Sequence, residues 1–235
     1  MKSKIAFLIL SVFCVLSAFS FERTERMSLS ASGIDKLMIE CGSGFLYVIG
    51  EESLTNIQVE AEIIVKGKRE QDMDSYVAEN VKLELKKQGN KAVLVSLFKN
   101  TFPGINFREK VINLTIQVPK NMDLEVDDGS GEIKIENIDG NLQIDDGSGE
   151  IIARDILGSV NIDDGSGTID IDNVTGSVTI DDGSGTIEVN DIGNNVEVSD
   201  GSGSIYIDGV VGDVIIKEEG SGSVRIQNVK GKVIK

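Results

Sequence analysis

The sequence contains no histidine and no tryptophan, and only two of its 235 residues are cysteine. Without histidine no Ser-His pair can form, so the serines that recur between glycines are interpreted as small turn residues rather than nucleophiles. These serines are Ser130, Ser148, Ser166 and Ser184. A polysaccharide-degrading β-helix could use carboxylates as acid and base, but the turns are too short to build cleft walls and aromatic residues are mostly confined to the first third. The sequence therefore predicts a non-enzymatic protein.

The N-terminus predicts export. The first 20 residues, MKSKIAFLILSVFCVLSAFS, contain two lysines, an apolar run and a small-x-small ending, the pattern of a signal peptide cleaved after Ser20. An uncleaved anchor is the alternative, but the run over residues 5–19 is shorter than the ~20 residues that a spanning helix needs. A lipid-modified Cys14 is a third possibility, disfavoured by Phe13 where a small residue is expected.

Cleavage after Ser20 leaves Cys41 as the only cysteine, so no intramolecular disulfide can form. No second apolar segment is long enough to span a membrane. We therefore expect an exported mature chain (periplasmic, cell-surface or secreted) without a transmembrane segment.

Basic residues are scarce in the second half of the chain. The net charge is −16, and residues 127–222 contain 23 acidic and 3 basic residues. Such an acidic body repels phosphate backbones, which excludes nucleic acid as a partner. Basic residues return only in the last row, at Arg225, Lys230, Lys232 and Lys235. On a terminal strand they would discourage end-to-end growth; a basic docking site is the alternative.

An 18-residue unit repeats from residue 124 onward. Its rows read LEVDDGSGEIKIENIDGN, LQIDDGSGEIIARDILGS, VNIDDGSGTIDIDNVTGS, VTIDDGSGTIEVNDIGNN and VEVSDGSGSIYIDGVVGD. A sixth row, VIIKEEGSGSVRIQNVKGK, is one residue longer, and we expect a bulge between residues 216 and 220 to absorb the extra residue. Each row contains two alternating stretches separated by glycine-containing turns, which predicts β-strands with one buried face.

Apolar residue types recur at the same phase of every row. One column holds Leu142, Val160, Val178, Val196 and Val214, and a second holds Ile133, Ile151, Ile169, Ile187 and Ile205. Such columns are typical of coils stacked in register at ~4.8 Å, whereas an antiparallel meander requires only the alternation. The sequence predicts an all-β fold, a single-stranded parallel β-helix (β-solenoid) with 18-residue coils over residues 119–235.

Residues 30–118 are predicted to form a first coil and a β-rich cap with one short helix. The stretch LMIECGSGFLYVIG (37–50) matches the repeat phase, with Cys41 in the place of the second aspartate. Strands are expected at 57–65, 81–85, 92–98 and 111–118, a helix at 69–81, and a hairpin turn at QGNK. Residues 21–29 are expected to be a disordered N-terminus.

The chain resembles the putative adhesin family of bacterial envelope proteins over about residues 30 to 235. The stretches that carry the resemblance are ECGSGFLYVIG, VINLTIQVPKNMDLEVDDGSGEIKI and the four GSG coils that follow. The resemblance implies a single-stranded parallel β-helix, exported or tethered to the envelope, and for some members a part in envelope stress responses. It implies no catalytic or binding residues. This chain departs from the family by placing Asp-Asp before GSG, where Lys, Thr or Ser is common.

The Asp-Asp pairs form two columns with different predicted tasks. The first aspartate column is Asp127, Asp145, Asp163 and Asp181, and the second aspartate column is Asp128, Asp146, Asp164, Asp182 and Asp200. Alternation points the first column into solvent, where it is a candidate binding face. The second begins the turn and is predicted to accept hydrogen bonds from the turn backbone, with Ca²⁺ binding as a further possibility. No other cofactor is predicted.

The sequence names no ligand. Five aromatic residues of the first third, Phe45, Tyr47, Phe98, Phe102 and Phe107, could form a recognition patch or simply close the core of the cap. We expect an adhesin-like binding or structural module of the cell envelope with an unknown envelope or extracellular ligand. The alternative is a calcium-stabilised structural or envelope-stress sensing module.

Overall fold

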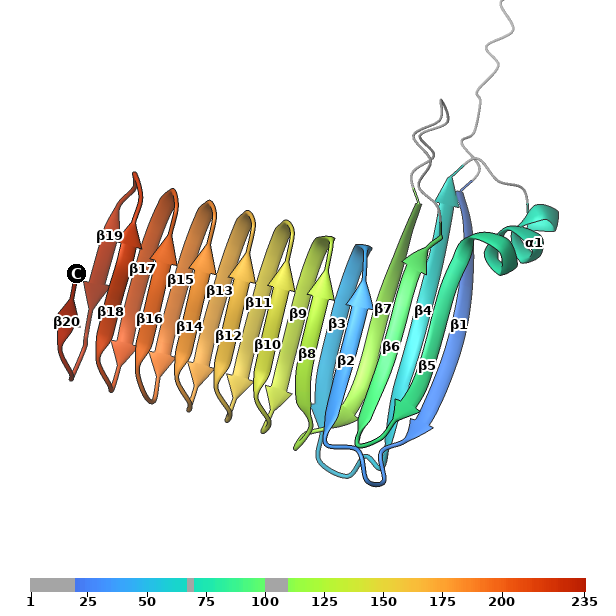
Figure 1. The fold of residues 1–235 in the computed structure, drawn as a ribbon, viewed down its shortest axis with the longest axis horizontal. Helices are drawn as coiled ribbons and strands as arrows, with labels where there is room; N and C mark the ends of the chain where they lie inside the picture. Colours follow the sequence, from blue (N-terminus) through green and yellow to red (C-terminus); the bar gives the residue numbers. More distant parts are fainter. Residues whose placement is uncertain (1–19, 67–69, 100–109) are drawn as a thin grey trace, which may run out of the picture.

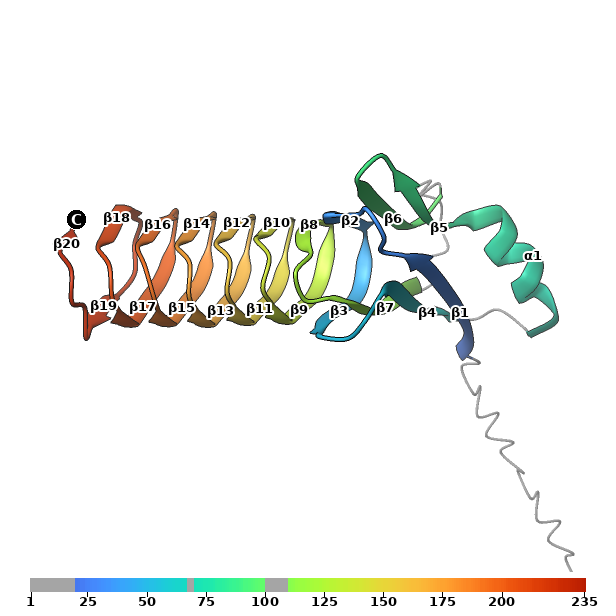
Figure 2. The same cartoon turned by 90° about the horizontal axis from the view of Figure 1, so that it is seen from below.

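The computed structural model describes residues 20–66, 70–99 and 110–235. Two ten-stranded β-sheets face each other along an elongated solenoid (Figures 1 and 2). Sheet A has the order β1 (Ser20–Ser30), β4 (Asn56–Lys66), β7 (Lys110–Pro119), β3 (Ser43–Glu51), β9 (Ser130–Ile138), β11 (Gly149–Ile156), β13 (Gly167–Val174), β15 (Gly185–Ile192), β17 (Gly203–Val210), β19 (Val224–Gln227). Sheet B has the order β20 (Val233–Ile234), β18 (Val214–Glu219), β16 (Val196–Asp200), β14 (Val178–Asp182), β12 (Val160–Asp164), β10 (Leu142–Asp146), β8 (Asp123–Asp128), β2 (Lys36–Cys41), β6 (Lys91–Phe98), β5 (Val81–Gln88).

Each repeat contributes one strand to each sheet, and strands of successive repeats pair in parallel. Ile144 pairs with Ile162 and Ile151 with Ile169, so the register advances by one 18-residue repeat per coil. This arrangement confirms the predicted β-solenoid. The register shifts where β16 pairs with β18, because Ser199 lies opposite Glu218. The extra residue of the sixth row is therefore absorbed as predicted.

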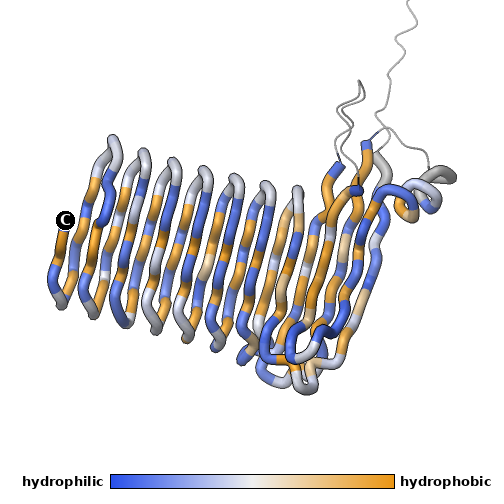
Figure 3. Tube along the Cα trace, viewed as in Figure 1, coloured by the Kyte–Doolittle hydropathy of each residue, from blue (hydrophilic) through white to orange (hydrophobic). Residues whose placement is uncertain are grey.

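The core is a narrow file of side chains between the two sheets. On β9 and β10 the inward apolar residues are Ile133, Ile135, Ile138, Leu142 and Ile144, all of them 0–1% exposed. Figure 3 shows the resulting alternation of apolar and polar residues along the coils. Full burial of each such side chain contributes roughly 1.5–3 kcal/mol, so the coils are held mainly by these aliphatic columns.

The strands of sheet A bend at residues with positive φ. Asn137 (φ 66°), Asp155 (φ 57°), Asn173 (φ 56°) and Asp191 (φ 53°) lie at the same phase of successive coils. Asn and Asp adopt this left-handed conformation more readily than other residues that have a side chain. At Asn137 two residues separate the inward Ile135 from the inward Ile138, so the bend lets each coil bury a third aliphatic side chain from sheet A.

The N-terminal part of the chain extends the stack out of chain order. Strand β2 lies between β8 and β6, and β3 lies between β9 and β7, with all of these pairs parallel. The inserted strands β6 and β7 therefore stack on the first coil. Antiparallel pairing of β1 with β4, β4 with β7 and β5 with β6 then closes this end. The predicted strands and hairpin are present, and helix α1 (Glu70–Asn80) occupies the predicted helical segment.

The predicted disorder of residues 21–29 is wrong. These residues belong to β1, which pairs with β4 from Ser20 to Ser30. The segment contains four charged residues, yet Met27 and Leu29 are half-buried and pack against the core. The remaining residues of the predicted signal peptide, 1–19, lie outside the described residues.

Candidate functional site

The first aspartate column lies on the outer face of sheet B. Asp127, Asp145, Asp163 and Asp181 are all exposed, and consecutive members are direct register partners. In the described part of the chain, no hydrogen bond or ion pair involves these four carboxylates. Two like charges ~4.8 Å apart in water repel by about 1 kcal/mol. The column is thus a row of free, hydrated negative charge, as the sequence predicted.

Two other acids on this face are paired. Glu125 accepts a hydrogen bond from Lys36 at 2.9 Å, and Glu197 forms an ion pair with Lys217. A shallow groove of about 300 Å³ lies over the C-terminal half of the row, where Asn161 and Thr179 join Asp163 and Asp181 in its lining. The free carboxylates therefore border amide and hydroxyl groups that can also form hydrogen bonds to a ligand.

The second aspartate column points into the protein. Asp128 is 7% exposed, Asp146 3%, Asp164 and Asp182 2% each, and Asp200 is fully buried. The side chains follow the inward Leu142 and Ile144 columns on the same strands. The sequence predicts these residues at the start of the turn, and their burial is an additional finding of the structure. Strict alternation from Leu142 through Ile144 to Asp146 contained that signal.

Three members of the second column also cap their turns, as predicted. The backbone N–H of Ser166 donates to Asp164 Oδ1 at 3.1 Å, that of Ser184 to Asp182 Oδ1 at 3.0 Å, and that of Ser202 to Asp200 Oδ1 at 2.9 Å. Each bond spans two residues and forms an Asx-turn. One carboxyl oxygen of each of these residues is thereby satisfied.

The remaining oxygens of the second column have no partner. Oδ2 of Asp164, Asp182 and Asp200 and both carboxyl oxygens of Asp146 are buried without a hydrogen bond. Burial raises the pKa of Asp146 to about 6, and the stacked carboxylates of Asp128 and Asp164 add to the effect. Burial likewise raises the pKa of Asp182 to about 6 and raises those of Asp128, Asp164 and Asp200. An ionised carboxylate is therefore disfavoured throughout the column.

Calcium binding by the second column stays a prediction. Ca²⁺ takes six to eight oxygen ligands, and the described residues contain no group of three or more Asp, Glu, Cys or His side chains that could hold a metal ion. The stacking therefore places these aspartates in a file without gathering them around one point.

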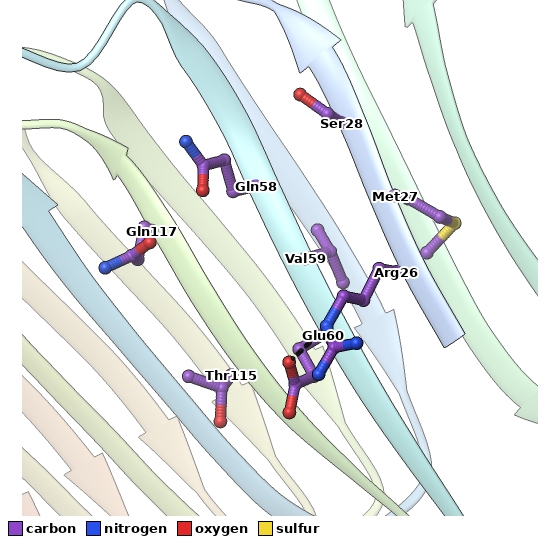
Figure 4. A pocket seen from close by; sticks show the side chains of 8 residues that line it. All are labelled: Arg26, Met27, Ser28, Gln58, Val59, Glu60, Thr115 and Gln117. Carbon is purple, nitrogen blue, oxygen red and sulfur yellow. Dashed lines mark hydrogen bonds and ion pairs between the residues drawn. The ribbon is translucent and has the colours of Figure 1, made fainter. Parts of the chain in front are cut away.

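A second groove crosses the outer face of sheet A at its N-terminal end, with a volume of about 630 Å³ (Figure 4). Gln58 of β4 lies opposite Gln117 of β7, and Arg26 of β1 donates to Glu60 at 2.8 Å. The lining is polar and close to neutral in charge, unlike the acidic row of sheet B. The sequence analysis did not identify this groove, because nothing in the local pattern shows that β1, β4 and β7 are neighbours.

The predicted aromatic patch is divided between the two sheets. Phe45 and Tyr47 stack on β3 of sheet A with ring centroids 6.2 Å apart, whereas Phe98 ends β6 of sheet B and packs against the core. Phe102 and Phe107 lie outside the described residues. The structure thus places the three described aromatic residues in no common patch.

The C-terminal basic residues lie on the last coil, as predicted. Strands β19 and β20 are the final strands of their sheets, and Arg225, Lys230, Lys232 and Lys235 are exposed there. Lys235 lies 3.7 Å from Glu219 of β18. Among the described residues, no helix is long and apolar enough to cross a membrane.

Comparison with known proteins finds similarity at the level of solved structures. A putative cell adhesion protein from Clostridium sporogenes is 16% identical, covers 88% of this chain and 99% of its own, and gives a TM-score of 0.47. A putative lipid binding protein from Parabacteroides distasonis is 16% identical, covers 91% and 97%, and gives 0.40. A putative adhesin from Bacteroides fragilis is 12% identical, covers 90% and 96%, and gives 0.38. No family model matches the chain, and no curated protein does. Two of these three structures carry the adhesin or adhesion name of the family that the sequence resembles.

Proposed function

We propose that the protein is an exported, non-enzymatic, adhesin-like module of the cell envelope that binds its ligand through the first aspartate column. The proposal rests on one exposed row, whose carboxylates have no partner in the described part of the chain. The row consists of Asp127, Asp145, Asp163 and Asp181. On sheet A, by contrast, Arg154 pairs with Asp170 and Lys134 pairs with Glu136. A row of four stacked carboxylates without a partner favours a ligand that supplies positive charge.

The regular spacing favours a ligand that is itself repetitive. The row presents one carboxylate per coil on a parallel sheet, so its charges recur at ~4.8 Å. Each single contact in water is weak, but several contacts along one polymer add because they are linked. In an envelope polymer that carries amines or other cationic groups beside hydroxyls, the cationic groups would pair with the carboxylates. Its hydroxyls would form hydrogen bonds with Asn161 and Thr179 in the groove.

A binding assay with labelled protein and isolated cell envelopes tests the proposal. The double variant Asp163→Asn/Asp181→Asn is expected to lose most of the binding at low ionic strength. The matched control Asp172→Asn/Glu188→Gln removes the same charge from the outer face of sheet A and is expected to keep it. Equal losses would reduce the effect to net charge and overturn the assignment of the face. Degradation of any polysaccharide in a panel of acidic and neutral substrates would overturn the non-enzymatic assignment.

The alternative is a calcium-stabilised structural or envelope-stress sensing module. It is favoured by the same row, because a divalent cation between stacked carboxylates would relieve their repulsion. Thermal unfolding with Ca²⁺ and with EDTA separates the two functions. A midpoint that does not change removes the calcium alternative and leaves the binding proposal standing.

A further inference from the structure

A continuous file of buried polar side chains runs along the inner face of sheet B. Its members occupy the same phase on seven neighbouring strands, from Asp200 of β16 through Cys41 of β2 to Ser96 of β6. The file consists of Ser96, Cys41, Asp128, Asp146, Asp164, Asp182 and Asp200. Every other inward column of the solenoid is aliphatic. A buried polar file of this length requires hydrogen-bond partners that aliphatic neighbours cannot supply.

The protein supplies about half of those partners. Where Asp164, Asp182 and Asp200 accept the serine N–H of their turn, the second oxygen is left over. The other N–H groups of the turns are already used, since Gly147 N–H donates to Asp128 O at 3.1 Å and Gly149 N–H to Ser166 O at 3.0 Å. The N–H groups of Gly147 and Ser148 offset part of the rise in the pKa of Asp146, but neither makes a well-aligned hydrogen bond to its carboxyl oxygens. Two donors are therefore missing at Asp146 and one each at Asp164, Asp182 and Asp200.

The charged groups around the file are acidic. Asp127, Asp163 and Asp181 lie on the outer face of the same strands and add to the rise in the pKa of their buried neighbours Asp128, Asp164 and Asp182. At one end the Cys41 thiol hydrogen-bonds Asp128, and burial together with Asp128 raises the pKa of Cys41. At the other end Glu219 is the register partner of Asp200. The side chains of sheet A that face the core are aliphatic. Among the groups that shift the pKa values of the five buried aspartates, none is basic.

We propose that the second aspartate column is a proton-binding site, in which protons held on the orphaned carboxyl oxygens supply the missing donors and tie the coils together. A proton is the ligand that fits best. It needs no room, it removes the charge that burial penalises, and it converts an acceptor into a donor toward the next coil. Ca²⁺ would need six to eight oxygens, and the described residues gather no group of three ligand side chains.

This site makes the solenoid sensitive to acidity. The folded-state pKa of Asp146 and Asp182 is about 6, above the ordinary value of 3.8. Protons bound in the folded state therefore stabilise it fully below pH 3.8, and this stabilisation is lost as the pH rises through about 6. The coils are expected to be most tightly held in mildly acidic surroundings and to loosen toward alkaline pH. This consequence is independent of any ligand on the first column.

Asparagine tests the proposal because it is a permanently neutral copy of the protonated acid. In Asp146→Asn/Asp182→Asn, the amide oxygen at position 182 can keep the turn hydrogen bond from Ser184, while the amide N–H₂ groups at both positions can donate toward the neighbouring coils. We expect the melting temperature of this variant at pH 7.5 to exceed that of the unaltered protein, and its fall between pH 4 and pH 8 to be smaller. The matched control Asp145→Asn/Asp181→Asn removes the same charge on the same strands from the outer face. It is expected to keep the pH-dependent fall.

Three results would overturn the proposal. The first is an inner variant with an unchanged pH-dependent fall in melting temperature. The second is a rise in the melting temperature of the unaltered protein on adding Ca²⁺ at pH 7.5 that the inner variant abolishes, because the file would then bind a cation. The third needs no variant: carbon-13 NMR titration of the aspartate carboxyls of the unaltered protein should show buried carboxyls with midpoints above 5, and midpoints all below 4 would contradict proton binding.

Discussion

The second glycine of each GSG turn sets how closely two coils can approach, and Gly149→Ala probes that contact. Gly149 has φ +147°, and a Cβ atom there would lie 1.7 Å from the carbonyl oxygen of Gly131 on the preceding coil. Cβ atoms in proteins essentially never lie closer than 3.0 Å to such an atom, and an ordinary contact is 3.4–4 Å. The two coils would therefore have to separate by more than an ångström at this corner, or the turn would have to change its conformation.

The cost of this substitution has two parts. A residue with a side chain in this region of φ is strained by roughly 1–3 kcal/mol. Separating the coils weakens the two hydrogen bonds that join them at this corner, from Gly131 N–H to Ser148 O at 3.0 Å and from Gly147 N–H to Asp128 O at 3.1 Å, at about 0.5–1.5 kcal/mol each. We expect a total loss of roughly 3–5 kcal/mol, a large share of the 5–15 kcal/mol that stabilises a typical domain.

The matched control is Gly89→Ala in the turn between β5 and β6. Gly89 also has positive φ, at +65°, but a Cβ atom there meets nothing within 4 Å. Its substitution is expected to cost only the left-handed strain of about 1–2 kcal/mol. Urea unfolding followed by circular dichroism measures both losses, and hydrogen exchange should localise the Gly149→Ala effect to β9, β11 and β13. Equal losses in the two variants, or a smaller loss for Gly149→Ala, would refute the reasoning from coil contact.

Two further predictions concern the core and the pH dependence. Ile169 is fully buried, so Ile169→Ala should lower the free energy of unfolding by about 2–5 kcal/mol. Leu157 is 57% exposed, so Leu157→Ala should change it by less than about 0.5 kcal/mol. Urea titrations measure both values, and similar losses would contradict the assigned core. The rise in pKa from 3.8 to about 6 at Asp146 and Asp182 corresponds to about 3 kcal/mol per group. The free energy of unfolding should fall between pH 4 and pH 7, and a rise over that interval in urea titrations at fixed ionic strength would refute this sign.

Much of the architecture follows from the sequence, because in a solenoid the repeat determines which residues are in contact. Each residue at one phase lies beside the residue of the same phase in the next coil, so columns such as Ile151, Ile169 and Ile187 predict register and burial together. The bulge in the sixth row follows from the length of that row, which is one residue longer than the others. The hairpin β5–β6 and the helix α1 follow from local signals of turn and periodicity.

The strand pairing at the N-terminal end could not be predicted in this way, because these strands do not belong to a repeat that would indicate which strands pair. Alternation indicates that β6 and β7 are strands, but it does not say that they pair with β2 and β3 out of chain order. Strand β1 is polar on both faces apart from a few residues such as Met27 and Leu29, and its order comes from pairing with β4. Non-local pairing of this kind, not local propensity, also forms the groove at Arg26 and Gln117.

The sequence predicts each Asp-Asp pair to be an exposed residue followed by a turn residue, and the structure adds that the second residue is buried. Adjacent residues of a strand point to opposite faces, so one dipeptide repeated in register builds two columns in different media. The charges of the first column lie in water and are screened within a Debye length of ~10 Å at 0.1 M salt. The charges of the second are buried and are removed by protons instead. Binding through the first column should therefore respond to ionic strength, whereas the rigidity set by the second should respond to pH.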